Sequence, residues 1–141
     1  MTRIDFHTNI TDKVSYACRL ARKAYAARGK LVLLASDAAE ADALDKALWS
    51  VGDTDFLPHV MASDQLAPVT PIIVTASLNG QLPHYCMLVN LTRTTPPGFE
   101  RFERVFEIVS QDEDDVAAGR IRYAAYKQQS HTLTHHVADP S

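Results

Sequence analysis

Short apolar runs alternate along the chain with longer segments in which apolar residues recur at helical spacing. Continuous runs are typical of strands that are covered on both faces, and the wider spacing is typical of helices that pack one face on a core. The predicted strands are 3–7, 31–35, 55–59, 72–76 and 86–91, and the predicted helices are 13–28, 37–49, 96–109 and 111–127. This alternation predicts parallel β-α-β units with right-handed crossovers.

The order of the elements predicts an α/β fold. We expect a single-domain, Rossmann-like three-layer sandwich with a mostly parallel sheet of about five strands. The length of 141 residues suits one domain, and no linker or internal repeat divides it. The predicted domain covers residues 1–129. Residues 130–141 show no apolar period, so we expect them to form a loose C-terminal tail.

Capping residues support the starts of the predicted helices. Thr11 or Asp12 can cap the first helix, and Asp37 followed by Glu40 three residues later resembles a capping box. The acidic run 112–115 at the start of the last helix complements the helix dipole. The local start signals therefore agree with the periodicity.

The composition narrows the class of protein. The formal net charge is −3, from 14 Lys and Arg against 17 Asp and Glu, whereas a protein that coats nucleic acid usually has a clear basic excess. No apolar run approaches the length of a membrane span, and the N-terminus lacks a signal-peptide pattern. We therefore expect a cytoplasmic protein with no membrane partner.

A Rossmann-like sheet is compatible with two functions that other features of the chain count against. A nucleotide-binding enzyme is the first, but the chain has no GxGxxG after its first strand, no GxxxxGK[ST], and only five glycines, so no nucleotide-binding glycine loop is predicted. A direct single-stranded DNA binder is the second. It would use Tyr16, Tyr25 and the basic face of the first helix, and the negative net charge counts against it. That face carries Arg19, Arg22, Lys23 and Arg28.

Histidines near the C-terminus do not define a metal site. His131, His135 and His136 lie in a polar segment without a cysteine or a predicted helix beside them. Solvated side chains are the simpler interpretation of such a pattern. The residues predict no metal, no cofactor and no catalytic group.

Trp49 and the loop after it form the first group of residues that core packing does not fully explain. Trp49 ends the second predicted helix, and the loop carries Phe56, Leu57 and Pro58. A Trp at a helix end is often part of the core. Trp and Phe are also frequent anchors of protein interfaces, so this group is a candidate docking edge.

Arg120, Tyr123 and Lys127 form the second group. Their spacing places them on one face of the last predicted helix. A solvated helix face explains this pattern. Cations beside an aromatic ring also suit an acidic peptide or a carboxylate, so the face is a candidate binding site.

Three stretches of the chain resemble the chi subunit family of bacterial DNA polymerase III. The stretches are Asp45-Lys-Ala-Leu-Trp49, Phe56-Leu-Pro58-His59 and Arg122-Tyr-Ala-Ala-Tyr-Lys127. The length and the order of the elements also agree, so the resemblance covers almost the whole chain. It implies a non-catalytic accessory subunit of the clamp-loader complex that acts in DNA replication in the bacterial cytoplasm, at the replisome on the nucleoid, and contacts DNA only through its partners.

The resemblance also implies partners for the two groups. Proteins of this family bind the psi subunit and the acidic C-terminal tail of single-stranded DNA-binding protein, and a helicase-like repair protein is a further implied partner. The positions implied for psi are Trp49, Phe56, Leu57 and Pro58. The positions implied for the acidic tail are Val109, Arg120, Tyr123 and Lys127. The chain departs from the family pattern at Val116 and Ala124, where better-known members carry lysines, which predicts weaker binding of the acidic tail.

Overall fold

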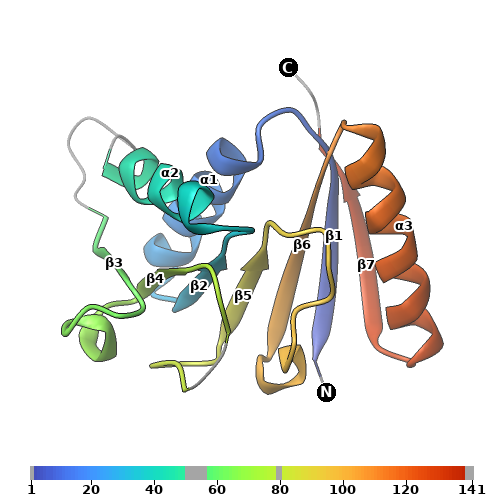
Figure 1. Ribbon diagram of the computed structural model, residues 1–141. Coiled ribbons are helices and arrows are strands. Elements are labelled where there is room, and N and C mark those ends of the chain that lie inside the picture. Colours follow the sequence, from blue (N-terminus) through green and yellow to red (C-terminus); the bar gives the residue numbers. More distant parts are fainter. Residues whose placement is uncertain (1, 50–56, 79–80, 139–141) are drawn as a thin grey trace.

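A sheet of seven strands forms the centre of the protein (Figure 1). The computed structural model describes residues 2–49, 57–78 and 81–138. The strands are β1 (Arg3–Ile10), β2 (Leu31–Leu34), β3 (His59–Met61), β4 (Ile72–Thr75), β5 (Met87–Asn90), β6 (Arg104–Ser110) and β7 (Thr132–Val137). Their order is β3-β4-β2-β5-β6-β1-β7, and every neighbouring pair is parallel. The predicted Rossmann-like α/β fold is therefore confirmed, with seven strands instead of five.

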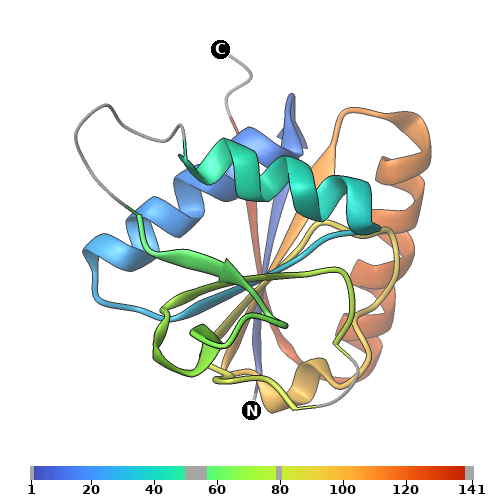
Figure 2. The ribbon, with the colours of Figure 1, turned by 60° about the vertical axis from the view of Figure 1, so that its left-hand side comes forward.

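Helices cover both faces of the sheet, which gives the three predicted layers (Figures 1 and 2). On one face lie α1 (Lys13–Ala26) and α2 (Ala38–Trp49), and on the other lies α3 (Glu113–Gln128). The short 3-10 helices η1 (Ala67–Val69) and η2 (Phe99–Arg101) contribute to the core on the α3 side. Successive residues of β2 enter the two cores alternately, which explains its continuous apolar run. No helix in the described part of the chain is long and apolar enough to cross a membrane.

The helix predicted over 96–109 is wrong, because this segment forms η2 and then β6. Phe99 and Phe102 are buried beside η2, whereas Val105, Phe106 and Val109 are buried on the two faces of the strand. The spacing of these residues fits a helical stripe as well as it fits a turn followed by a fully buried strand. Periodicity alone does not separate the two for a short apolar segment.

The segment expected to be a loose tail contains β7. This strand pairs in parallel with β1, from Arg3 opposite Thr132 to Thr8 opposite Val137. Leu133 packs against the core, while the rest of the strand is exposed at the edge of the sheet. Hydrogen bonding of the backbone to β1 holds the strand, so its sequence needs no run of buried apolar residues.

The predicted caps of the first two helices are present. At the start of α1, Asp12 Oδ1 accepts a hydrogen bond from the Ser15 N–H at 3.2 Å. Before α2, Asp37 accepts from the Glu40 N–H and Glu40 accepts from the Ser36 N–H, both at 2.8 Å. These reciprocal bonds fix the turn between β2 and α2, as a capping box does.

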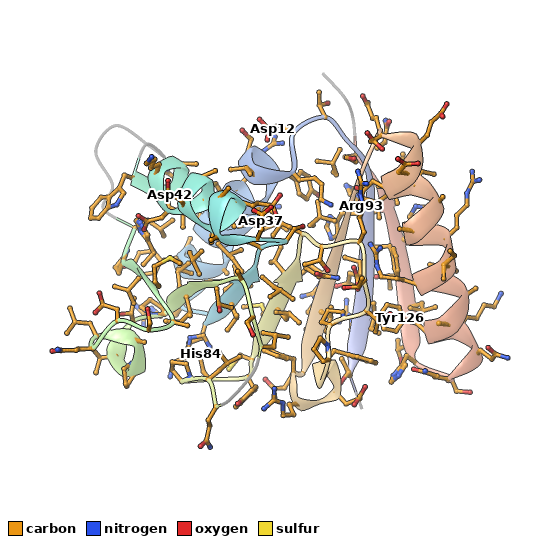
Figure 3. All side chains as sticks on the ribbon, viewed as in Figure 1. Asp12, Asp37, Asp42, His84, Arg93 and Tyr126 are labelled. Atoms are coloured by element: carbon orange, nitrogen blue, oxygen red, sulfur yellow. The ribbon has the colours of Figure 1, made fainter. Side chains whose placement is uncertain are left out.

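A buried polar cluster joins β6 to α3. Glu107 is fully buried and accepts hydrogen bonds from Asn90 Nδ2 at 2.8 Å, Arg122 Nε at 3.1 Å and the Tyr126 hydroxyl at 2.6 Å. Tyr126 projects from α3 toward the strands (Figure 3). Burial, and then the carboxylate of Glu107, raise the pKa of Tyr126 far above its usual value, so its hydroxyl stays a donor. Because any other position of α3 would leave buried charges unpaired, the cluster favours one register of the helix.

We expect Glu107→Gln to lower the free energy of unfolding by about 3–5 kcal/mol, because it leaves the buried Arg122 guanidinium without its counter-charge. Urea denaturation of the wild type and the variant measures this difference. The matched control is Glu103→Gln at the exposed start of the same segment, for which we expect a change within about 0.5 kcal/mol. Equal effects of the two substitutions would contradict a structural role for the buried pair.

Candidate functional site

A groove of about 560 Å³ runs between α3 and the strands beneath it. This volume is typical of a binding pocket. We call it the α3 groove, and its lining residues are Phe6, Thr8, Val109, Val116, Gly119, Arg120, Tyr123, Ala124, Lys127 and His135. The structure thus brings together all four residues that the sequence suggested for an acidic tail.

The α3 groove combines an apolar floor with an aromatic ring and two cations. Val109 and Phe6 are buried in the floor, and the ring of Tyr123 meets that of Phe6 edge-on at a centroid distance of 5.1 Å. Arg120 and Lys127 are exposed, about one helical turn before and after Tyr123. Among the described lining residues none is acidic, and in the described ranges neither cation forms an ion pair. The groove therefore suits a ligand with both apolar and anionic groups.

Contacts at the start of α3 fix the orientation of the helix. The carboxylate of Asp115 is buried and accepts from the Ser110 N–H at 2.6 Å and from Lys13 Nζ at 3.1 Å. Burial alone would raise the pKa of Asp115, but the Ser110 N–H and the Lys13 ammonium outweigh burial and lower it. Arg93 lies near the same helix end (Figure 3). Its Nε is 3.4 Å from Asp115 Oδ1, and its Nη2 is 3.4 Å from Asp112 Oδ1. Together with the Glu107 cluster further along the helix, these contacts tie α3 to the sheet.

Gly119 allows α3 to approach β6 closely below the groove. A Cβ atom at this position would lie 2.9 Å from Val109 Cγ2 and 3.2 Å from Val109 Cγ1. These distances are shorter than ordinary van der Waals contacts, so a larger residue would push the helix or Val109 away. The depth of the groove therefore depends on glycine here.

Four lining residues were not anticipated from the sequence: Phe6, Thr8, Gly119 and His135. Phe6 and Thr8 come from β1, and His135 comes from β7, which reaches the groove only through its pairing with β1. The Thr8 hydroxyl and His135 Nε2 are 2.8 Å apart. Only Gly119 had a local signal, a glycine inside an otherwise helical segment, which often marks close packing.

The second candidate surface gathers two of the stretches that resemble the chi family. Trp49 is 60% exposed, and its ring contacts the buried His59 ring at a centroid distance of 4.8 Å. His59 Nε2 also lies 3.3 Å from Oδ1 of Asp45, one turn before Trp49 on α2. We call Trp49 and Pro58 the Trp49 surface, and the buried His59 lies beneath Trp49. The stretch at the end of α2 and the stretch at the start of β3 therefore form one contact unit.

Phe56, Leu57 and Pro58 were also expected on this docking edge, and they differ in how far the structure exposes or describes them. Leu57 is only 5% exposed and packs in the core beside α2, so its expected place on the docking edge is corrected: it supports the surface from below. Pro58 is partly exposed. Phe56 lies outside the described residues. Trp49 is thus the exposed aromatic side chain on which the candidate surface depends.

The three C-terminal histidines lie in different surroundings. His131 packs against Phe99 and Tyr126, with ring centroids 5.2 Å and 6.0 Å away. His135 lines the α3 groove, whereas His136 faces His7 on β1 at 5.3 Å. Alternation along β7 separates the last two onto opposite faces of the sheet. Within the described ranges no group of three His, Cys, Asp or Glu could hold a metal ion.

The parallel sheet with helices on both faces defines the class of protein as a Rossmann-like α/β domain. A solved structure supports this class: T4 UvsW superimposes with a TM-score of 0.71 over 97% of this chain and 41% of the UvsW chain. The two sequences are 8% identical, so the likeness concerns the fold alone. The chain spans less than half of the UvsW chain that it matches.

Sequence comparisons define the family. A family model described as "DNA polymerase III chi subunit, HolC" matches residues 1–134. A protein of Pseudomonas aeruginosa named DNA polymerase III subunit chi is 33% identical over 141 residues, which cover 96% of each chain. One of the same name from Haemophilus influenzae is 25% identical over 118 residues, covering 84% of this chain and 82% of the relative. The chain belongs to the chi subunit family of DNA polymerase III, which confirms the resemblance and places it in DNA replication.

We expect Gly119→Ala to destabilise the wild type by about 1 kcal/mol, because the overlap with Val109 outweighs the gain in helix propensity. In a Val109→Ala background the overlap is removed, so the same substitution should stabilise the protein by about 1 kcal/mol. Urea denaturation of the four proteins in this double-mutant cycle measures both effects. Equal effects of Gly119→Ala in the two backgrounds would contradict the close approach of α3 to β6.

Proposed function

We propose that the protein is a non-catalytic adaptor of DNA polymerase III. In this proposal the α3 groove binds the acidic C-terminal tail of single-stranded DNA-binding protein, and the Trp49 surface binds the psi subunit. The observation that carries the proposal is the convergence of Val109, Arg120, Tyr123 and Lys127 in one groove. These partners are those that the resemblance to the chi family implies.

The chemistry of the groove supports binding of an acidic tail that ends in an aromatic residue. The guanidinium of Arg120 can bond a carboxylate with two parallel N–H donors, and Lys127 adds a second cation. Tyr123, Phe6 and Val109 offer a surface for an apolar side chain. Because Arg120 and Lys127 are exposed, the electrostatic part of the binding should weaken as salt is added.

Two neutral residues limit the positive charge of the groove. Val116 and Ala124 both line it. The resemblance to the chi family implies lysines at these two positions in better-known members. The described lining residues include two cationic side chains, those of Arg120 and Lys127. We therefore propose a weaker contact with the acidic tail than in members that have the additional lysines.

The arrangement of the sheet supports simultaneous binding of the two partners. The ring of Trp49 contacts His59 of β3 at one edge of the sheet, and the α3 groove includes His135 of β7 at the other edge. Strands are about 4.8 Å apart, so the six spacings between these edges correspond to roughly 30 Å. Two partners at this separation need not compete, as an adaptor requires. The helicase-like repair protein stays a prediction of the resemblance.

We expect Arg120→Ala to weaken binding of a peptide that ends in acidic residues and Phe by about tenfold, or 1.4 kcal/mol, because a charged hydrogen-bond donor is lost. Titration calorimetry on the folded proteins measures the affinities. The matched control is Arg19→Ala, which removes an exposed arginine from α1 on the other face of the sheet and should leave the affinity unchanged. Wild-type affinity in Arg120→Ala would contradict the groove assignment.

We expect Trp49→Ala to reduce co-purification with the psi subunit more than tenfold, because a large exposed aromatic anchor is removed. The control is Leu66→Ala, which truncates another side chain that is 60% exposed, on the segment between β3 and η1. Circular dichroism verifies that both variants are folded. Recovery of psi with a folded Trp49→Ala variant at the wild-type yield would place the psi contact elsewhere.

A further inference from the structure

The charges of the chain are strongly segregated. Residues 13–36 contain six Lys or Arg and no Asp or Glu. The rest of the chain then has eight Lys or Arg against all 17 acidic residues. The net charge of −3 is therefore the sum of an acidic remainder and a basic segment, residues 13–36, which comprises α1, the turn after it and β2.

Two adjoining grooves lie on this basic segment. The first, of about 490 Å³, is lined by residues of α1 that include Tyr16, Arg19 and Lys23. The second, of about 420 Å³, includes Tyr25, Arg28 and Lys30, and Ala26 lines both. We call Tyr16, Arg19, Lys23, Tyr25, Arg28 and Lys30 the basic surface. It runs along the helix and continues past its C-terminal end.

The four cations of the basic surface are available to a ligand. All four are exposed, and in the described ranges none of them takes part in an ion pair. Lys13, at the start of α1, differs because it is paired with the buried Asp115. Uncompensated cations in a row produce a positive potential that attracts a polyanion.

Each of the two grooves also has an aromatic ring in its lining, Tyr16 in the first and Tyr25 in the second. The guanidinium of Arg19 lies 5.3 Å from the centre of the Tyr16 ring, and the Tyr16 hydroxyl is held by a hydrogen bond with His7 Nδ1. Tyr25 is 40% exposed. Flat rings beside cations are the arrangement with which proteins bind single-stranded nucleic acid, since bases stack on the rings and phosphates lie against the cations.

We infer that single-stranded nucleic acid binds along the basic surface. The α3 groove has a floor of buried apolar side chains for the apolar end of an acidic peptide, whereas none of the described residues that line the two grooves on the basic segment is buried. Exposed rings and cations without such a floor suit stacked bases and phosphates better than an acidic peptide. The basic surface lies on the face of the sheet that α1 covers, whereas the α3 groove lies on the opposite face. The nucleic acid and an acidic peptide therefore need not compete. This inference does not rest on the proposed binding of the tail or of psi.

The test is fluorescence anisotropy of a labelled oligonucleotide of about 20 thymidines with the full chain, between about 50 and 200 mM salt. We expect affinity for the wild type that falls with salt, and a loss of about tenfold or more in Arg19→Ala/Lys23→Ala. The matched control is Arg120→Ala/Lys127→Ala, which removes the same charge from α3 and should bind as the wild type does. Absence of binding at low salt, or equal losses in the two double variants, overturns the inference.

A second variant separates nucleic acid from other polyanions. Tyr25→Leu keeps every charge but removes an exposed ring, so we expect about fivefold weaker binding of the oligonucleotide and unchanged binding of heparin. Circular dichroism verifies the fold of each variant. An unchanged oligonucleotide affinity in Tyr25→Leu overturns the assignment to nucleic acid and favours an acidic protein as the ligand of these cations.

Discussion

The position of α3 depends on the buried carboxylate of Glu107. It accepts hydrogen bonds from α3 through Arg122 and Tyr126, and from β5 through Asn90, in a region that water does not reach. Buried charges tolerate little displacement, because moving the helix by one residue would leave them unpaired. The same helix presents Arg120, Tyr123 and Lys127 on its other side. The geometry of the α3 groove thus depends on a buried cluster whose residues do not line the groove.

The three candidate binding surfaces lie at different places around the sheet. The Trp49 surface lies beside the β3 edge, the α3 groove lies toward the β7 edge, and the basic surface follows α1 on the face opposite α3. Their chemistry differs as well: an exposed aromatic ring, an apolar slot with cations, and a row of cations with aromatic rings. This separation leaves each proposed ligand its own surface on this subunit of DNA polymerase III.

Local sequence signals predicted what depends on local geometry. The residues Val116, Arg120, Tyr123 and Lys127 share a face because the α-helical period fixes it, and the caps of α1 and α2 follow from short-range hydrogen bonds. Elements that depend on distant pairing were missed. β7 is an edge strand that pairs with β1, more than 120 residues earlier in the chain. The sequence of β6 is compatible with a helix or a strand, and its pairing with neighbouring strands decides between them. For the same reason Phe6 and His135 of the groove were not foreseen.

Chemical-shift mapping is the sharpest test of whether an acidic tail binds in the α3 groove. Backbone amide spectra of the protein, recorded as an acidic peptide ending in Phe is added, show which residues the peptide contacts. If the tail binds in this groove, the shift changes are largest along the groove face of α3, from Val116 to Lys127, and at His135 of β7. Changes that are largest along the basic surface of α1, or that are absent at saturating peptide, would contradict binding in the groove.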